Sequence, residues 1–453
     1  MGRTHRARSQ PRTGKGGGRN SFPPDRLAHC SEEFAMENAA TPAQKAGQPP
    51  AILTALEAVS RPDPYPTYRS IQESGAFIRC DVGGWVTTMV TGYADCSATF
   101  QSPSFGSGYS AGIHADAHRA PGSTDSGLKS LLRKDPPEHT RLRGLVSRAF
   151  TPGVVATLTE EITSLVDTLL DAALAAAEVD LIEAFARPLP LFVICRLLGV
   201  PAQDEPVFSE WIVPMVRGLA PDMTLTPEDL RARTEATNAI HDYFRELVAE
   251  VRARPRHDLL SQLVAAARDS DDLPEQEILD LCVLLLVAGF ETTVNLIGSG
   301  TVALLRNPDQ LARLRADPDL VPAAVEEMLR YDPTFPFTVR TALRDTEVNG
   351  RPFRRGDGVV LLLAAANRDP GAYREPDRFD VARYADSTDV PRHLGLGLGV
   401  HYCLGAPLAR AEGVIAFRAL LARAGRITLL DEPSYRTSAW VRAMSQLPIG
   451  LSG

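Results

Sequence analysis

One cysteine near the C-terminal end lies between a glycine-rich segment and a helical pattern. Residues 393–410 read His-Leu-Gly-Leu-Gly-Leu-Gly-Val-His-Tyr-Cys-Leu-Gly-Ala-Pro-Leu-Ala-Arg, and an alanine-rich helical pattern covers residues 406–421. A cysteine just before a helix faces free N–H groups and the positive end of the helix dipole, which both stabilise a thiolate. Glycines on the approach let the backbone lie close to a large flat group, because they have no Cβ. The segment therefore predicts that Cys403 is an anionic sulfur ligand beneath a planar cofactor.

Three other interpretations of this segment are weaker. A lone cysteine is usually a small buried hydrophobic residue. A dinucleotide-binding glycine loop should follow an apolar strand, whereas residues 387–392 read Ser-Thr-Asp-Val-Pro-Arg. A zinc site needs further cysteines or histidines at short spacing, and only His401 is near. The thiolate ligand is the interpretation that uses both the cysteine and the glycines.

The segment resembles the cysteine-ligand loop of the cytochrome P450 family, whose pattern is Phe-Gly-x-Gly-x-His-x-Cys-x-Gly. Every fixed position matches except the first, where this chain has Leu396. The resemblance implies that Cys403 binds the iron of haem b and that His401 and Gly405 contact the cofactor. In the family, the missing phenylalanine shields the thiolate and tunes its hydrogen bonds, so exchange of Leu396 for phenylalanine is expected to shift the haem reduction potential.

Length and composition limit the class of protein. The chain has 453 residues, 44% of them hydrophobic, which allows one large domain or two or three average ones. The formal net charge of −8 gives no overall attraction to nucleic acid. Six scattered cysteines without paired spacing favour a reducing cytoplasm over a disulfide framework. No apolar run reaches the roughly 20 residues of a membrane span, so we expect a soluble cytoplasmic protein.

The first part of the chain differs from the rest in composition. Residues 1–45 are rich in Arg, Gly, Ser and Pro and have few large apolar side chains whose burial could offset the entropy of ordering. We expect a disordered basic extension there, and one haem-monooxygenase domain over residues 46–453. Met36 is an alternative start, which would leave residues 1–35 outside the natural protein.

Helical periodicity dominates the middle of the chain. Proline residues at 214 and 221 are expected to interrupt it, and the gap between residues 215 and 227 corresponds to a lid in the family. The helices are predicted at residues 155–176, 185–198, 207–216, 227–252, 259–267 and 274–306.

The last of these helices carries polar groups in an apolar run. Residues 284–293 read Leu-Leu-Leu-Val-Ala-Gly-Phe-Glu-Thr-Thr. Gly289 costs about 1 kcal/mol relative to alanine in a helix, and a threonine hydroxyl can simply bond the carbonyl four residues earlier. The row also resembles the family's Ala-Gly-x-Glu-Thr unit, which opens a groove for dioxygen above the haem. The resemblance implies that Glu291 is the acid and Thr292 the alcohol that deliver protons.

Two further segments match the family's contacts to the haem propionates. Residues 135–143 read Asp-Pro-Pro-Glu-His-Thr-Arg-Leu-Arg, with prolines suited to the first turn of a helix. His139 and Arg143 share one helix face, which taken alone would indicate an ordinary solvated stripe. The resemblance implies that both hold propionates, since a guanidinium fork suits a carboxylate. It adds Arg340 and His401 as further contacts.

A predicted helix at residues 321–330 carries Glu327 and Arg330 three positions apart. An exposed ion pair of this kind contributes little stability. However, the pair matches the family's Glu-x-x-Arg motif, and Arg383 matches the arginine that follows it in the family. The resemblance implies that the three side chains form a buried network behind the cysteine loop.

A long loop is expected at residues 105–127, which show no helical or strand period. Loops of this length in a compact domain are usually functional or mobile. Residues 108–112 read Gly-Tyr-Ser-Ala-Gly and fit the elbow of serine hydrolases, but that elbow needs a preceding strand and a following helix. Neither context is present, so a serine hydrolase is a distant alternative.

Together the motifs follow the family's order from about residue 50 to the end. The resemblance implies a mainly α cytochrome P450 fold with small β-sheets, and a haem-thiolate monooxygenase of secondary metabolism. It would use O2 to hydroxylate or epoxidise a small organic substrate. The sequence has no flavin or iron–sulfur segment, so electrons from NAD(P)H are expected through a ferredoxin and its reductase, with Arg141 and Arg148 as docking charges. We expect a monomer.

The resemblance also assigns a substrate pocket and leaves alternatives open. The same fold could catalyse oxidative C–C, C–N or C–O coupling or use peroxide, and a non-catalytic haem-binding protein is an alternative of another class. The substrate itself is not readable, beyond a medium-sized molecule with some polar groups. The predicted pocket residues are Leu284, Val287, Ala288, Phe335, Pro336, Thr338, Trp440 and Val441.

Overall fold

The structure, a computed structural model, describes seven segments of the chain, all of which lie within Pro42–Gly453. The expected N-terminal extension with Met36, the hydrolase-like motif, most of the 105–127 loop and the middle of the expected lid lie outside the described residues. The described residues are 50–82, 85–107, 131–217, 225–269, 273–385, 389–436 and 440–453.

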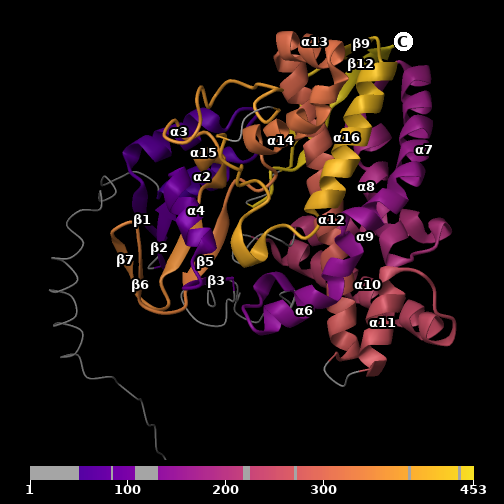
Figure 1. The fold of residues 1–453 in the computed structure, drawn as a ribbon, viewed down its shortest axis with the longest axis horizontal. Coiled ribbons are helices and arrows are strands. Elements are labelled where there is room, and N and C mark those ends of the chain that lie inside the picture. Colours follow the sequence, from indigo (N-terminus) through magenta and orange to yellow (C-terminus); the bar gives the residue numbers. More distant parts are fainter. Residues whose placement is uncertain are drawn as a thin grey trace, which may run out of the picture. The chain divides into compact units, whose positions relative to one another are not determined.

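Helices dominate the described chain, and the predicted mainly α class with small sheets is confirmed (Figure 1). The longest helix, α12, contacts α8, α10, α14 and α16 and so forms the centre of the helical part. The longer helices are α6 (Glu138–Val146), α7 (Pro152–Ala176), α8 (Pro188–Leu198), α9 (Glu205–Arg217), α10 (Pro227–Ala253), α11 (Leu259–Asp269), α12 (Glu275–Arg306), α14 (Val321–Tyr331) and α16 (Ala406–Arg423). The shorter ones are α2 (Ala51–Ala58), α3 (Tyr65–Ser74), α4 (Tyr93–Gln101), α13 (Pro308–Ala316) and α15 (Leu363–Ala366).

The largest sheet has the strand order β1-β2-β8-β5-β3, with a parallel pair only between β2 and β8. Smaller sheets have the orders β4-β12-β9, β6-β7 and β10-β11. The strands of the large sheet are β1 (Phe77–Val82), β2 (Trp85–Val90), β3 (Phe105–Gly106), β5 (Thr338–Ala342) and β8 (Gly358–Leu361). The others are β4 (Glu178–Asp180), β6 (Thr346–Val348), β7 (Arg351–Phe353), β9 (Arg426–Leu429), β10 (Ser434–Tyr435), β11 (Met444–Gln446) and β12 (Pro448–Ser452). Two short helical turns also matter for the site, η2 (Ser147–Phe150) and η7 (Gly399–His401).

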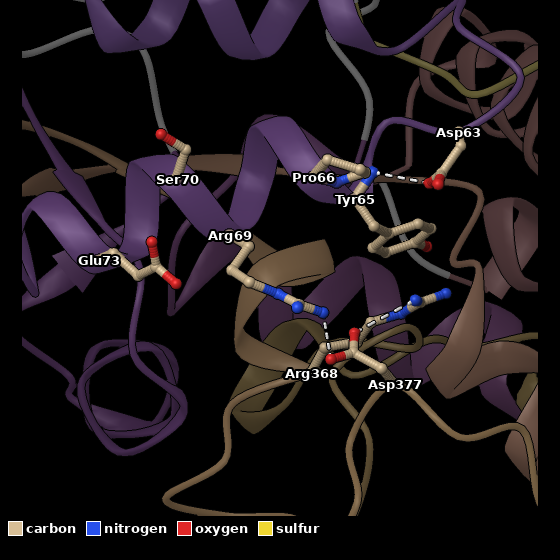
Figure 2. A pocket seen from close by; sticks show the side chains of 8 residues that line it. All are labelled: Asp63, Tyr65, Pro66, Arg69, Ser70, Glu73, Arg368 and Asp377. Carbon is tan, nitrogen blue, oxygen red and sulfur yellow. Dashed lines mark hydrogen bonds and ion pairs between the residues drawn. The ribbon is translucent and has the colours of Figure 1, made fainter.

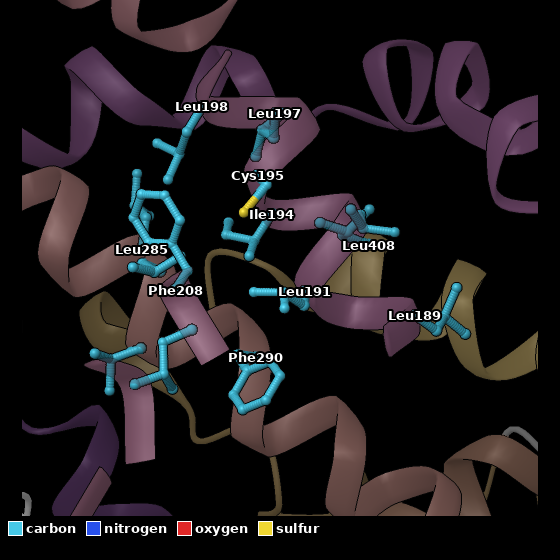
Figure 3. Packing of buried hydrophobic residues seen from close by; sticks show 14 of the residues in the cluster. Leu189, Leu191, Ile194, Cys195, Leu197, Leu198, Phe208, Leu285, Phe290 and Leu408 are labelled. Carbon is cyan, nitrogen blue, oxygen red and sulfur yellow. The ribbon is translucent and has the colours of Figure 1, made fainter. Parts of the chain in front are cut away.

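The core around α12 explains its unusual composition. A helix that is apolar all round must be buried, and 83% of the most apolar part of α12 is enclosed by the protein. It is the one helix in the described residues that is long and apolar enough to cross a membrane. Side chains from α8, α9, α12 and α16 belong to one buried cluster, in which Figure 3 labels Ile194, Phe208, Leu285 and Leu408.

Gly289 of α12 has a packing role in this core. A Cβ at this position would lie only 3.1 Å from Cδ1 of Ile194 in α8. Glycine therefore lets α8 and α12 approach closely, which offsets its cost inside a helix. This contact is a reason for the glycine in addition to the groove that the sequence predicts.

Two expectations from the sequence were wrong. Pro214 does not interrupt a helix but lies inside α9, because buried side chains such as Phe208 and Ile212 fix the helix against its neighbours and offset the lost hydrogen bond. Phe105 and Gly106 are not loop but form β3, which pairs with β5. A strand of two residues is too short to produce a period in the sequence.

Candidate active site

Cys403 lies between η7 and α16, at the end of the glycine-rich segment. Its N–H donates to the carbonyl of Leu396 at 2.9 Å, which closes the turn. Gly397 and Gly399 have φ values of 67° and 70°, a region that glycine adopts without strain. A Cβ at Gly399 would lie 2.4 Å from the carbonyl oxygen of Phe100. Glycine at residue 399 therefore lets the loop pack directly on the backbone at the end of α4.

The groups around Cys403 shift the pKa of its thiol in opposite directions. Burial is the largest effect and raises its pKa. The N–H groups of Gly405 and Ala406 and the charges of Arg143 and Arg410 lower it. These groups are the ones that stabilise a thiolate, and a cation bound to the sulfur would complete that stabilisation.

Two histidines lie side by side at the cysteine loop, His139 of α6 and His401 of the loop itself. Their ring centroids are 4.2 Å apart, and within the described residues the buried Nε2 of each makes no hydrogen bond. Burial, together with repulsion from His401 and Arg143, lowers the pKa of His139 to about 4. Burial also lowers the pKa of His401, and Arg340 and Arg143 add to this, whereas Asp135, whose carboxylate lies 3.9 Å from its Nε2, acts in the opposite direction. The four predicted propionate contacts are thus close enough to influence one another.

The two arginines of this group also contact the cysteine loop and its neighbours. Arg143 donates from Nη2 to the carbonyl of Tyr402 at 2.8 Å. Arg340 donates to the carbonyl of Val339 at 2.7 Å, and its guanidinium lies 5.0 Å from the centre of the Phe100 ring. Since both arginines approach the loop that carries Cys403, a carboxylate ligand next to this loop would meet two guanidinium groups and two histidines.

One face of α12 is open where the sequence predicts the oxygen groove. Ala288 is exposed and Thr292 is half-buried, although their neighbours along the helix belong to the core. The two residues are one turn apart and therefore share a face. The Thr292 hydroxyl donates to the Ala288 carbonyl at 2.7 Å, and Thr334 donates to the Thr292 carbonyl at 3.3 Å. The back-bond expected of any helical threonine is thus present.

Glu291 points away from this face and is buried, with 2% of its surface exposed. Its carboxylate lies 3.4 Å from Nη1 of Arg436, and Asn295 donates to it at 3.3 Å. Burial raises the pKa of Glu291, while Arg436, Asn295 and Arg187 act in the opposite direction. Asn295 also accepts from the N–H of Met444 in β11 at 2.7 Å. The predicted acid is therefore held by the C-terminal strands.

The pairing of Glu291 with Arg436 predicts a measurable change in the pKa of Glu291 when Arg436 is replaced. Replacing Arg436 by methionine should raise the pKa of Glu291 further, because the substitution removes the largest of the effects that lower it. The measurement is an infrared titration of the carboxyl stretch, with Glu291→Gln identifying the band. Arg187→Met is the matched control and should raise the pKa less. A band that titrates at the same pH in all three proteins would exclude this role of Arg436.

Glu327, Arg330 and Arg383 come together behind the cysteine loop. Arg330 binds Glu327 through Nε at 2.7 Å and Nη2 at 2.8 Å, and both side chains are fully buried. Arg383 approaches the same carboxylate at 3.0 Å, and the N–H of Asp380 donates to it at 3.0 Å. Arg330 also donates to the Asn367 carbonyl at 2.8 Å. The carboxylate thus joins α14 to the segment that precedes the cysteine loop.

The predicted pocket residues fall into two groups. Leu284 and Val287 belong to the main core beside the exposed Ala288. Residues 335–338 lead into β5, and Trp440 packs on this segment through an edge contact of 4.8 Å to Phe337. The first group lies on α12. The second consists of half-buried Phe335, buried Pro336, half-buried Thr338, half-buried Trp440 and buried Val441.

A surface cleft of 370 Å³ lies among other residues (Figure 2). Three of its charged groups pair with each other: Asp377 binds Arg69 and lies 3.5 Å from Arg368. The Arg368 guanidinium also stacks 3.2 Å from the centre of the Tyr65 ring. Ion pairs and stacking account for this arrangement, and it shares no residue with the predicted site. Its lining is Asp63, Tyr65, Pro66, Arg69, Ser70, Glu73, Arg368 and Asp377.

Several residues at the site were missed from the sequence. Glu326 binds both His393 and Arg410, and Arg410 binds the hydroxyl of Tyr402. Three of these residues stand in the cysteine segment itself, but nothing in its spacing identifies Glu326, 67 residues before His393, as their partner. Arg436 was missed for the same reason, since it is 145 residues from Glu291.

Glu412 of α16 is another buried carboxyl that the sequence did not reveal. Burial raises its pKa to about 8, and its Oε2 has no hydrogen-bond partner among the described residues. The folded chain then keeps a proton that the unfolded chain releases above about pH 4.3. This contribution to stability is present in acid and is lost as the pH rises through about 8.

We therefore expect the free energy of unfolding to fall by several kcal/mol between about pH 5 and pH 9, and the Glu412→Gln variant to lack most of this slope. Urea unfolding of both proteins in the same haem-loaded state measures it. Parallel curves for the two proteins would show that Glu412 is not the titrating group.

Comparison with known proteins extends the resemblance beyond the motifs. A family model described as Cytochrome P450 matches residues 50–423. The cytochrome P450 monooxygenase PikC of Streptomyces venezuelae is 39% identical over 412 residues, 88% of this chain and 94% of the relative. The polyketide biosynthesis cytochrome P450 PksS of Bacillus subtilis (strain 168) is 39% identical over 326 residues, 71% of this chain and 78% of the relative.

A solved structure has the same arrangement of elements. The crystal structure of P450BioI in complex with an acyl carrier protein ligated with hexadec-9Z-enoic acid superposes with a TM-score of 0.78 and 34% identity. The match covers 86% of this chain and 99% of that one. At this identity and coverage, the helices and small sheets described above share their topology with that structure.

Proposed function

This chain belongs to the cytochrome P450 family and is a haem-thiolate monooxygenase, and we propose that it hydroxylates or epoxidises a small organic substrate of secondary metabolism. The observation that carries this proposal is the position of Cys403, at the end of a glycine-rich loop and before α16, with N–H groups and two arginines around the sulfur. The relative PksS, which is named for polyketide biosynthesis, supports the metabolic context.

The residues at the cysteine loop fit a haem b. Cys403 would bind the iron, and the propionates would accept hydrogen bonds from Arg143, Arg340, His139 and His401. A Cβ at Gly405 would meet nothing within 4 Å, which leaves that side of the loop open to a flat group. When bound, a haem iron with a thiolate ligand supplies cleavage of O2, with one oxygen atom entering the substrate and the other leaving as water.

The chain's own part in the reaction is to deliver protons and keep bulk water away. Thr292 and Ala288 form the open face of α12, and Thr292 would hold a proton donor at its hydroxyl. Glu291 would supply the proton, because its raised pKa keeps a larger protonated fraction near neutral pH. To reach Thr292, its carboxyl must leave Arg436 and turn toward the open face.

Electrons would come from NAD(P)H through a ferredoxin and a ferredoxin reductase. Of the two predicted docking charges, Arg148 in η2 is exposed, whereas Arg141 pairs with Glu277 at 2.8 Å. Arg148 is therefore the better candidate for a contact with an acidic ferredoxin. We infer a monomer in the cytoplasm that binds neither nucleic acid nor a membrane.

The side chains near the proposed pocket favour a medium-sized substrate with polar groups. Phe335 and Trp440 offer aromatic surface, and the buried Nε1 of Trp440 has no partner in the described residues. A buried indole N–H without an acceptor would be stabilised by a hydrogen bond to a substrate oxygen. Ligand screening by the low-spin to high-spin change of the Soret band would identify the compound class.

Three measurements test the function. The reduced protein with carbon monoxide should give the Soret shift of a thiolate-bound haem, and substrate should stimulate NADPH consumption in a ferredoxin system. Product formed under labelled O2 should carry the label. Unlabelled product would favour oxidative coupling instead, and a thiolate spectrum without NADPH consumption would favour a non-catalytic haem-binding protein.

Leu396 gives a further expectation for the ligand. It is half-buried and packs against the core cluster that includes Met328 and Phe417, and its carbonyl accepts from the Cys403 N–H. Leu396→Phe should leave haem bound and lower its reduction potential, because a larger ring excludes water from the sulfur and disfavours the added negative charge. An unchanged potential would mean that another side chain already fills this space.

A further inference from the structure

We propose that Glu326 fastens the cysteine loop, residues 393–403, at both ends, and that Glu326 and Arg410 are positioning residues that set the haem reduction potential. The inference rests on the proposed role of Cys403 as the ligand. It concerns an ion pair separate from the Glu327 network, although the two glutamates are adjacent in α14.

The first end of the loop is fixed by His393, which is buried. Its Nδ1 accepts a hydrogen bond from the N–H of Gly395 at 3.2 Å. A ring nitrogen that accepts carries no proton, so the neutral ring has its hydrogen on Nε2. Nε2 lies 3.1 Å from Oε2 of Glu326 and donates to it. The start of the loop is thus bound to the carboxylate.

The second end is fixed through Arg410 of α16. Its guanidinium binds Glu326 with both prongs, Nε to Oε1 at 2.5 Å and Nη2 to Oε2 at 2.9 Å. The remaining Nη1 donates to the Tyr402 hydroxyl at 2.9 Å. Tyr402 directly precedes Cys403, and its carbonyl accepts from Arg143. The residue before the ligand is therefore held on both sides.

Glu326 and Arg410 form a charged pair near neutral pH. Burial alone would raise the pKa of Glu326, but the hydrogen bonds from Arg410 and His393 outweigh it and lower the pKa to about 2. A bidentate pair has a fixed geometry, and Glu326 is shielded on most of its surface. Arg410 thus stays beside the ligand instead of turning into solvent.

A fixed charge pair near the ligand affects reduction of the iron, which adds one negative charge. The positive charge of Arg410 favours that change and the negative charge of Glu326 disfavours it. Arg410→Gln should therefore lower the midpoint potential, whereas Glu326→Gln should raise it. The double variant should return close to the wild-type value. A purely structural role predicts shifts of one sign that grow in the double variant.

Spectroelectrochemical titration of the haem-loaded proteins tests this inference. Arg418→Gln is the matched control, because Arg418 lies on the same helix but its ion pair with Asp319 is exposed and 3.9 Å long. It should leave the potential unchanged. Arg410→Lys keeps the charge without the fork and should fall between Arg410→Gln and wild type. Tyr402→Phe keeps all charges, so it should leave the potential unchanged and speed haem transfer to apomyoglobin severalfold.

Two results would overturn the inference. One is a shift of the same sign in Arg410→Gln and Glu326→Gln, and the other is shifts no larger than that of Arg418→Gln. In either case a wild-type spectrum of a thiolate-bound haem leaves the ligand assignment intact. If the wild-type protein itself lacks that spectrum, the proposed function fails first.

Discussion

Replacement of Glu327 by alanine is expected to leave the protein without stably bound haem. The substitution removes the carboxylate that Arg330 and Arg383 share, while the Arg330 guanidinium remains fully buried. A buried charge without its partner costs about 3–5 kcal/mol, a large part of the stability of a typical domain. The same carboxylate also accepts from the N–H of Asp380, so the segment before the cysteine loop would lose its attachment to α14.

Haem content per protein, from pyridine haemochrome absorbance, measures this expectation. Glu327→Gln keeps the shape and one acceptor, so it should retain more haem than the alanine variant. Glu375→Ala is the matched control, because its pair with Arg378 is exposed on both sides and such pairs contribute little. Normal haem content in Glu327→Ala would show that the network does not support the cofactor.

Local patterns in the sequence predicted most of the helices, because the formation of a helix depends mainly on the residues within it. The 32-residue α12 was expected one residue longer at its start, and α16 begins at the predicted Ala406. An apolar run and a proline or glycine at its end carry this information. By contrast, β3 has two residues and exists only because β5 is there to pair with it.

Pairings between distant segments could not be predicted in the same way. Glu291 was identified from its neighbours in one helical row, yet its partner Arg436 comes from the end of the chain. Glu326 was passed over in favour of Glu327, although each holds an arginine network of its own. The resemblance supplied one network because a family motif covers it. The other required coordinates, since no spacing links α14 to His393.

Replacement of Cys403 by serine is expected to lower the rate of monooxygenase turnover by about three orders of magnitude or more. A serine hydroxyl does not ionise under these conditions, so the N–H groups of Gly405 and Ala406 would have no anion to stabilise. The reduced variant with carbon monoxide should lose the thiolate-type Soret shift. Circular dichroism should remain unchanged, because the substitution is nearly isosteric.

Cys195→Ala is the control for Cys403→Ser, since it removes a thiol from the core beside α12 and should leave the spectrum as it is. A thiolate-type band that persisted in Cys403→Ser would require another cysteine ligand. The described residues contain four other cysteines, all of them buried, and burial raises the pKa of each: Cys80, Cys96, Cys195 and Cys282. Among these five, only the Cys403 thiol has arginine charges acting to lower its pKa. The loss of the band should therefore be complete.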